Sequence, residues 1–291
     1  MIKIKVGGVP EHFNLPWHLA LEARRFESLD IELTWSDYPG GSGAMAKALR
    51  DGELDAALLL TEGAVAAIAD GAAFKIVSLY TDSPLVWGIH VPATSRFRVE
   101  ADLRGARYAI SRLGSGSHLM AFVHARAKGW PVEQLAFVPV GNLAGAVDAF
   151  AGGNADVFFW EKFMTKPLVD AEQFRRVAEF TAPWPAFVVC VADTVAGEVR
   201  AAIMSAVALV LAEAQALSTA PEAASVIAQR YGLAAADVAE WLTVTRWSSG
   251  VGVATDDLGA ACAALGSLGV LPRALTAADC IAPAPRAHEG S

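Results

Sequence analysis

Two runs rich in glycine and serine stand just before helix-like segments, and both suit an anion. They are Gly-Gly-Ser-Gly at 40–43 and Arg-Leu-Gly-Ser-Gly-Ser at 112–117. The free N–H groups at a helix N-terminus attract negative charge, and two hydroxyls with a guanidinium add donors for a sulfonate, carboxylate or phosphate. The ligand-binding residues predicted here are Gly41, Ser42, Arg112, Ser115 and Ser117. The alternative for Ser117 is a plain helix N-cap, and Gly-Ser loops are ordinary at helix starts.

Two acids follow apolar, strand-like segments. Glu62 follows Ala-Ala-Leu-Leu-Leu-Thr, and Glu161 follows Asp-Val-Phe-Phe-Trp. A carboxylate beside Trp160 in a cleft can accept hydrogen bonds from an amino-substituted heterocycle. We therefore predict that Glu62, Trp160 and Glu161 bind ligand. The alternative is a surface pair between Glu161 and Lys162 or Lys166.

Further aromatic and polar residues follow the first strand-like segment or lie between the two halves of the chain. Trp87 and Trp184 stand in segments that connect the halves, where an indole ring can stack on a planar ligand or belong to the core. The loop after the first strand contains glycines that let a ligand approach the backbone. The residues predicted to bind from this loop are Glu11, His12, Phe13, Asn14 and Trp17. An ordinary strand-to-helix turn is the alternative for that loop.

Motifs of catalysis and cofactor binding are missing from the sequence. It contains no G-x-S-x-G elbow, no HExxH, no Walker loop and no dinucleotide fingerprint. Its three cysteines, Cys190, Cys262 and Cys280, lack metal-ligand spacing and are expected to be buried thiols. We therefore predict no catalytic residue, no metal and no cofactor.

The composition argues against a nucleic-acid partner. With 23 Lys and Arg against 31 Asp and Glu, the formal net charge is −8, without the basic footprint that phosphate backbones need. The most apolar run, 201–212, is shorter than the ~20 residues that span a bilayer, so we expect no membrane insertion. The first residues lack the apolar core of a signal peptide. We therefore expect a cytoplasmic location, or a periplasmic one if a leader has been removed.

The chain contains an internal repeat at a distance of about a hundred residues. Residues 48–58, ALRDGELDAAL, are similar to residues 149–159, AFAGGNADVFF. Each segment is typical of a helix that ends at glycine and of an aspartate that opens a strand. The glycines are Gly52 and Gly153, and the aspartates are Asp55 and Asp156. Asn142 takes the place that 40–43 holds in the first half, so we add it to the predicted ligand-binding residues.

Each half of the chain thus alternates strands and helices, which predicts two similar α/β lobes with parallel sheets covered on both faces. The expected strands are 2–6 and 108–111, followed by helices at 17–28 and 118–129. Strand-like runs at 83–91 and 184–191 predict two crossings between the lobes. Helices are expected at 196–217, 221–231, 236–246 and 255–269, returning to the first lobe. Lobe I is predicted to comprise 1–86 and 183–282, lobe II 87–182, and a flexible tail 283–291.

This layout resembles the type II periplasmic-binding-protein fold over essentially the whole chain. The segments that carry the resemblance are GGVPEHFNLPWHLALEARRF, LRDGELDAALLLTEG, LRGARYAISRLGSGSHLMA and WPAFVV. They look like the nitrate, sulfonate and taurine type of solute-binding protein and its thiamine-pyrimidine-precursor relatives. The opening GGVPEHFNLPW and the run ISRLGSGSH are similar to a leaderless subgroup of yeasts and bacteria.

The resemblance implies two lobes that close on a small ligand, without turnover, in a cleft at the carboxyl ends of the strands. The expected ligand is a planar or anionic metabolite, such as a thiamine pyrimidine precursor or an organosulfonate. An ABC permease is the expected partner if the protein is exported in another form. The alternative is a cytoplasmic enzyme on the same fold, either a lyase of the menaquinone-pathway type, for which Asn14 or Glu62 would serve, or an enzyme of pyrimidine-precursor synthesis.

Overall fold

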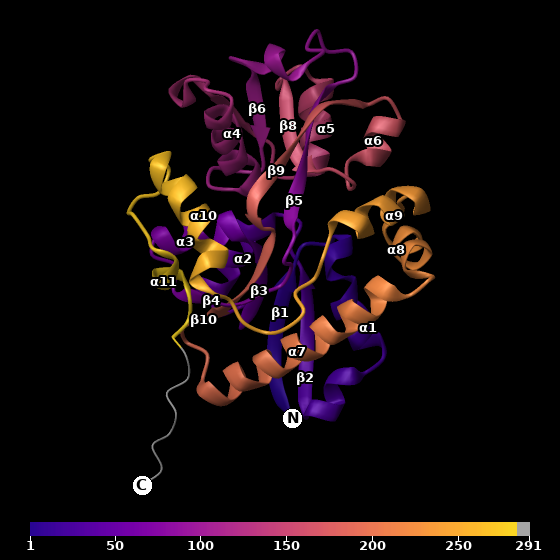
Figure 1. Ribbon diagram of the computed structural model, residues 1–291, viewed down its shortest axis with the longest axis vertical. Coiled ribbons are helices and arrows are strands. Elements are labelled where there is room, and N and C mark those ends of the chain that lie inside the picture. The colour runs from indigo at the N-terminus through magenta and orange to yellow at the C-terminus, as the bar shows by residue number, and fades with distance from the viewer. Residues whose placement is uncertain (284–291) are drawn as a thin grey trace.

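The computed structural model describes residues 1–283, which form two α/β lobes, one above the other (Figure 1). The strands of lobe I are β1 (Ile2–Gly8), β2 (Ile31–Asp37), β3 (Ala56–Leu60), β4 (Phe74–Leu79) and β10 (Phe187–Ala192). The strands of lobe II are β5 (Pro84–Pro92), β6 (Arg107–Ile110), β7 (Ala136–Pro139), β8 (Val157–Glu161) and β9 (Phe174–Pro185). The predicted tail lies outside the described residues, except for Pro283.

Each lobe contains one five-stranded sheet. The strand order is β2-β1-β3-β10-β4 in lobe I and β7-β6-β8-β5-β9 in lobe II. The main helices before the second crossing are α1 (Leu15–Glu22), α2 (Gly41–Arg50), α3 (Thr61–Ala69), α4 (Gly116–Ala127), α5 (Leu143–Ala151) and α6 (Lys166–Asp170). Every residue of β10 is buried, which requires cover on both faces of the sheet and explains its uninterrupted apolar sequence.

The internal repeat is a repeat of structure. The units β1-α1-β2-α2-β3 and β6-α4-β7-α5-β8 both place their first strand between the other two, with parallel pairing. Asp55 accepts a hydrogen bond from the Lys5 N–H at 2.8 Å, and Asp156 accepts the equivalent bond from Arg107 at 2.9 Å. The two aspartates therefore anchor the third strand to the first strand in each lobe.

The expectation of purely parallel sheets is wrong for one strand in each lobe. In lobe I, β10 runs antiparallel to β3 and β4, and in lobe II, β5 runs antiparallel to β8 and β9. Both strands arrive from the other lobe and enter their sheet at the edge where the repeat strands end. Their direction is therefore opposite to that of the repeat strands.

The two crossings between the lobes are shorter than predicted, because most of 83–91 and 184–191 belongs to strands. The crossing chain segments lie side by side, with the Ala186 N–H donating to the Ser83 carbonyl at 2.9 Å and the Phe187 N–H to the Thr81 hydroxyl at 3.0 Å. A third segment joins them, since the Asp82 N–H donates to the Arg246 carbonyl at 2.9 Å. These bonds define a compact hinge at the back of the cleft.

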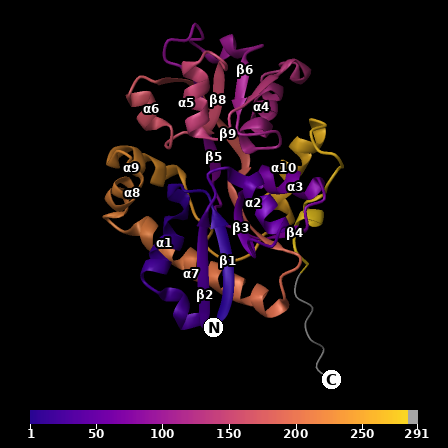
Figure 2. The ribbon, with the colours of Figure 1, turned by 180° about the vertical axis from the view of Figure 1, so that it is seen from behind.

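The C-terminal helices return to lobe I, as expected, but they also contact lobe II. These helices are α7 (Gly197–Thr219), α8 (Ala223–Tyr231), α9 (Ala235–Val244), α10 (Thr255–Ser267) and α11 (Ala277–Cys280). Figures 1 and 2 show α8 and α9 on one side of the molecule and α10 on the other. Helix α10 packs on β9 of lobe II, and Ile281 forms a parallel bridge to Ile76 of β4.

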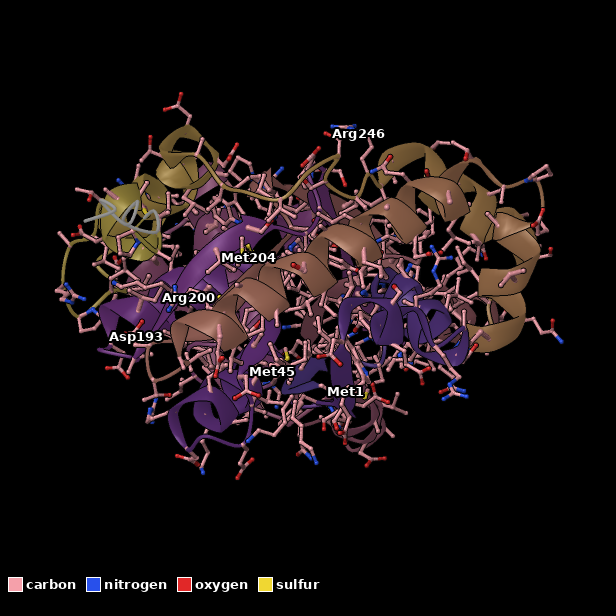
Figure 3. The ribbon with its side chains drawn as sticks, turned by 90° about the horizontal axis from the view of Figure 1, so that it is seen from below. Met1, Met45, Asp193, Arg200, Met204 and Arg246 are labelled. Atoms are coloured by element: carbon pink, nitrogen blue, oxygen red, sulfur yellow. The ribbon has the colours of Figure 1, made fainter. Side chains whose placement is uncertain are left out.

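Helix α7 crosses the lower side of lobe I, where Figure 3 marks it by Arg200 and Met204. Within residues 1–283 it is the one helix that is long and apolar enough to cross a membrane by length and composition. It packs against α1 and β1, and its buried side chains recur at helical spacing. They are Ala202, Ile203, Ala206, Val207, Val210, Leu211, Ala214 and Leu217. In this structure α7 is therefore a core helix of lobe I.

Candidate binding cleft between the lobes

A cavity of about 50 Å³ lies between the lobes, at the edge where the repeat strands end. Since one water needs roughly 10–15 Å³ of such space, the cavity has room for a group of about four non-hydrogen atoms in this closed arrangement. Its lobe I lining consists of Val9, Glu11, Gly40, Gly41, Ser42, Leu60 and Phe187. Its lobe II lining consists of Leu85, Trp87, Ser111, Arg112, Ser115, Gly116, Ser117, Trp160 and Glu161.

Some of the predicted ligand-binding residues line this cavity, and others lie behind its wall or in the core. The lining members of the predicted set are Glu11, Gly41, Ser42, Trp87, Arg112, Ser115, Ser117, Trp160 and Glu161. The predicted residues outside the lining are His12, Phe13, Asn14, Trp17, Glu62, Asn142 and Trp184. The cavity thus gathers residues that follow β1, β2 and β6 and the last two residues of β8.

Some side chains of the loop after β1 line the cavity, and others are buried in the core of lobe I. The 3-10 helix His12–Asn14 turns His12 under α9, where its ring centroid lies 4.1 Å from that of Trp241. Trp17 is fully buried in lobe I, and the Asn14 amide donates to the Val9 carbonyl at 2.8 Å. These side chains therefore support the loop that presents Glu11, and they do not line the cavity.

Asn142 is a helix cap in this structure. Its side chain accepts a hydrogen bond from the Gly145 N–H at 3.1 Å, which caps α5. In the corresponding loop of lobe I, residues 40–42 line the cavity. The repeat therefore predicts that the two loops fold alike, but it does not predict that both bind ligand.

Arg112 spans the cleft from lobe II to lobe I. Its guanidinium donates to the Gly40 carbonyl at 2.8 Å and lies against the first turn of α2. A β-carbon on Gly43 would lie 1.7 Å from the Arg112 Nη2 atom. The absence of a side chain at Gly43 is therefore what admits the guanidinium.

The serines at the start of α4 make local bonds as well as lining the cavity. Ser115, and not Ser117, caps the helix, accepting from the His118 N–H at 3.4 Å. Ser117 accepts from the Ser111 N–H at 3.0 Å, and the two hydroxyls are 3.1 Å apart. Because one hydroxyl must donate to the other, one hydroxyl proton remains for a ligand.

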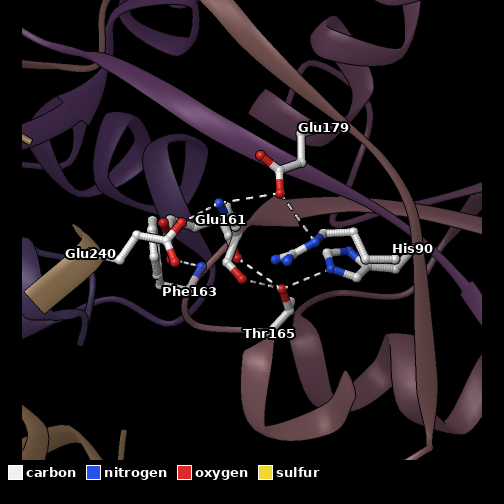
Figure 4. A network of polar contacts seen from close by, with 8 residues as sticks. His90, Glu161, Phe163, Thr165, Glu179 and Glu240 are labelled. Atoms are coloured by element: carbon white, nitrogen blue, oxygen red, sulfur yellow. Dashed lines mark hydrogen bonds and ion pairs between the residues drawn. The ribbon is translucent and has the colours of Figure 1, made fainter. Parts of the chain in front are cut away.

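Glu161 is buried at the end of β8, and its neighbours fix its orientation (Figure 4). Its Oε2 atom accepts from the Phe163 N–H at 2.8 Å and from the Met164 N–H at 2.6 Å. Burial raises the pKa of Glu161 to about 8, although these bonds favour the charged form. This shift favours the protonated form of the carboxyl near neutral pH.

The alternative pairing of Glu161 with a neighbouring lysine does not occur. Lys162 pairs instead with Glu240 at 2.7 Å and with Glu179 at 3.2 Å, and Figure 4 shows both partners. Lys166 pairs with Asp170 on its own helix. The lysine side chains therefore leave the Glu161 carboxyl to the cavity.

Glu62 lies directly behind the cavity wall, and only 1% of its surface is exposed. Its Oε2 atom accepts from the Trp184 indole N–H at 2.8 Å, and burial raises its pKa to about 7. Its Oε1 atom has no hydrogen-bond partner within residues 1–283, and it lies 3.3 Å from where a Gly116 β-carbon would be. Buried polar atoms normally have partners, so this acceptor marks the Gly116 wall as a place for a donor or a water.

The sequence reasoning missed part of the lining. Leu60, Leu85 and Phe187 form an apolar wall, and Gly116 gives the cavity its depth between Leu60 and Trp87. Leu60 is the last residue of β3, so the rule that ligands bind at the carboxyl ends of strands would have found it. Phe187 is the first residue of β10, which runs antiparallel to β3, so that rule does not select it. Among residues 1–283 no group of three or more His, Cys, Asp or Glu is placed to hold a metal.

The two repeats, the hinge strands and the shared cavity define a two-lobed protein of the type II periplasmic-binding-protein fold, as predicted from the sequence. Residues 87–180, most of lobe II, match the family model described as Ca3427-like PBP. No curated protein sequence matches the chain.

Solved structures with this fold cover nearly the whole chain. The Candida albicans CA3427 gene product is 26% identical over 94% of this chain and 92% of its own, with a TM-score of 0.85. The alkanesulfonate-binding protein SsuA of Xanthomonas axonopodis pv. citri, bound to MOPS, is 20% identical over 98% and 99%, with a TM-score of 0.79. SsuA of Escherichia coli is 18% identical over 100% and 95%, with a TM-score of 0.76.

Proposed function

We propose that this chain is a solute-binding protein that closes its two lobes on a small planar or anionic metabolite, without turnover. The observation that carries the proposal is the cavity itself, because Arg112, Trp160 and Glu161 of lobe II line it together with Glu11 and Gly41 of lobe I. A site assembled from both lobes exists only when they approach each other, so a ligand that fills it stabilises the closed form.

Two ligand classes match different side chains of the cavity lining. The carboxyl of Glu161 and the indole rings of Trp87 and Trp160 favour a planar ring with amino groups, such as a thiamine pyrimidine precursor. The helix starts at Gly41 and Gly116 favour an anion such as an organosulfonate. The SsuA structures support the second class by analogy of fold.

Mass spectrometry of small molecules released from natively purified protein tests the proposal directly. We expect one dominant metabolite, and its return to the stripped protein should lower the radius of gyration in small-angle scattering. Arg230→Gln is the control variant for the purification, since Arg230 pairs with Glu22 within lobe I and is not among the residues that line the cavity. An unchanged radius at demonstrated saturation contradicts closure.

An enzyme on the same fold is the second candidate, and the buried carboxyls favour it. Glu62 and Glu161 have pKa values raised to about 7 and 8 by burial, the range that suits general acid and base catalysis. Long incubation of the released metabolite with the protein separates the two candidates. Recovery of unaltered ligand supports binding alone, whereas a changed product supports the enzyme.

A further inference from the structure

Glu11 and Glu161 bring two carboxyls to one cavity from opposite lobes. Glu11 follows β1 in lobe I, and Glu161 ends β8 in lobe II. The two groups are near enough for the Glu11 charge to raise the pKa of Glu161. Two like charges at one site need a proton or a cation between them.

Neither carboxyl is in an ion pair with a lysine or arginine of the described residues. Lys162 lowers the pKa of Glu161, yet its ammonium is bound by Glu179 and Glu240 outside the cavity. Arg112 lines the same cavity, and its guanidinium donates to the uncharged Gly40 carbonyl and is in no ion pair recorded within residues 1–283. Two further titratable groups lie at this region. The Glu11 charge helps to raise the pKa of Tyr231, and Glu62, behind the Gly116 wall, has its pKa raised to about 7 by burial. Within residues 1–283 the recorded ion pairs therefore leave both carboxyls of the cavity without a cation.

A second observation at the same place is independent of the carboxyls. Trp87 stands opposite Glu161 in the pairing of β5 with β8, lines the cavity and is only 3% exposed. Its indole N–H has no hydrogen-bond partner within residues 1–283. A buried donor without a partner, beside a carboxyl of the same cavity, indicates that an acceptor atom of a ligand, or a water, completes this corner next to any group that the carboxyls bind.

We propose that Glu11 and Glu161 form a subsite for a protonated nitrogen of the ligand, an ammonium or amidinium group that bridges the two carboxylates as the lobes close. The inference rests on the proposed function and specifies the ligand class for it. The rings of Trp87 and Trp160 line the same corner, and aromatic rings add attraction for a cation. Because one carboxylate comes from each lobe, the cation itself holds the cleft closed.

The subsite predicts a release of protons on binding. In the empty cleft desolvation holds protons on both acids, and the Glu11 charge adds to this effect on Glu161, with pKa values of about 7 for Glu11 and about 8 for Glu161. A bound cation favours the carboxylates and lowers both pKa values, so protons leave as the cation enters. The affinity for a cation therefore rises with pH between 6 and 8.5, whereas the affinity for an anion falls.

Three probes of equal size test the inference, because acetamidinium, acetamide and acetate differ chiefly in charge. Each has four non-hydrogen atoms, which the cavity of about 50 Å³ can hold. We expect acetamidinium at pH 8.5 to bind at least 10-fold more tightly than acetamide, by titration followed with NMR. Its affinity should fall about 10-fold at pH 6. Glu11→Gln and Glu161→Gln should each weaken it 10-fold or more.

Glu179→Gln is the matched control, since Glu179 is a carboxyl near Glu161 that binds Lys162 outside the cavity. It should leave acetamidinium binding within 2-fold of wild type. Thermal unfolding at pH 6 checks that the glutamine variants fold, as expected when an amide replaces an acid that is already protonated.

The outcomes separate the inference from the proposed function. Acetamidinium that binds no better than acetamide, fails to bind at 50 mM or keeps its affinity in Glu161→Gln overturns the subsite. Preferred binding of acetate, lost in Arg112→Gln, overturns the subsite but leaves a solute-binding cleft. Failure of all three probes, with no metabolite released from the native protein, removes the proposed function as well.

Discussion

Arg112 and Gly43 meet across the cleft, and the guanidinium of Arg112 occupies the space that a side chain on Gly43 would need. The Cβ position of Gly43 is 1.7 Å from Arg112 Nη2 and 2.0 Å from its Cζ atom. Gly43 lies inside α2, without a positive φ, so alanine is compatible with its backbone. The glycine is thus required by the contact between the lobes, and the helix alone does not require it.

Gly43→Ala should therefore weaken closure without destabilising the fold. Alanine is favoured over glycine in a helix by about 1 kcal/mol, so the melting temperature should stay the same or rise. The displaced Arg112 should lose its bond to Gly40, and ligand affinity should fall by roughly 3- to 10-fold, the effect of about one hydrogen bond. Calorimetry with the released metabolite measures the affinity.

The double variant Gly43→Ala/Arg112→Ala provides the control for this contact. If the alanine acts only by displacing Arg112, the double variant should bind no more weakly than Arg112→Ala alone. An additive loss would contradict the contact and assign the effect of Gly43 to the shape of the loop.

Glu62 makes the stability of the protein depend on pH. Burial raises its pKa from 4.5 to about 7, so the folded state holds a proton that the unfolded chain releases. The contribution of Glu62 to the free energy of unfolding therefore falls as pH rises from about 4.5 to about 7, and it levels off above that range. Glu62→Gln should remove this part of the fall and stabilise the protein at pH 8 by up to about 3 kcal/mol more than at pH 4.5.

Urea unfolding at the two pH values measures this difference, with Glu133→Gln as an exposed control. The glutamine oxygen can still accept the Trp184 indole N–H, so the native contact survives the substitution. An equal effect of Glu62→Gln at both pH values would show that Glu62 ionises freely in the folded protein.

Of the two serines at the start of α4, Ser117 should contribute more to stability than Ser115, although Ser115 and not Ser117 is the helix cap. Ser117→Ala leaves the Ser111 N–H without its acceptor, at a cost of about 1–3 kcal/mol. Ser115→Ala removes the helix cap, at about 1 kcal/mol. Chemical denaturation of the ligand-free variants measures both, with the exposed Ser28→Ala as control. A larger loss for Ser115→Ala would reverse this assignment.

The repeat made much of the fold predictable from the sequence. The order of strands and helices in both halves, and the aspartates that open the third strands, follow from local signals such as Gly52 and Asp55. The helix expected at 17–28 ends early because Arg24 adopts a left-handed conformation, with φ of 55°. No glycine marks that break, so the periodicity alone extends the helix.

The contacts across the cleft were not predictable in the same way. The bond from Arg112 to Gly40 joins residues 72 positions apart, and it depends on the angle between the lobes. Local patterns in a sequence fix helices and strands, but they carry no information about that angle. The sequence therefore identified Arg112 as a polar residue at a helix start and not as a link between lobes.

The ion pair of Lys162 with Glu240 also joins the lobes, and it should make ligand affinity depend on salt. Glu240 belongs to α9, which is attached to lobe I, and its side chain is 55% exposed. Such pairs contribute roughly 0.2–1 kcal/mol, and here that energy is lost when the cleft opens. Glu240→Gln should therefore lower the apparent affinity by roughly 1.4- to 5-fold at low salt and by less at 0.5 M salt, where exposed charges are screened.

Glu22→Gln is a close control, because Glu22 is 56% exposed and pairs with Arg230 at the same distance of 2.7 Å, but within lobe I. Calorimetry at both salt concentrations should show an effect for Glu240→Gln alone, and an equal loss in both variants would mean that the pair with Lys162 does not favour the closed form.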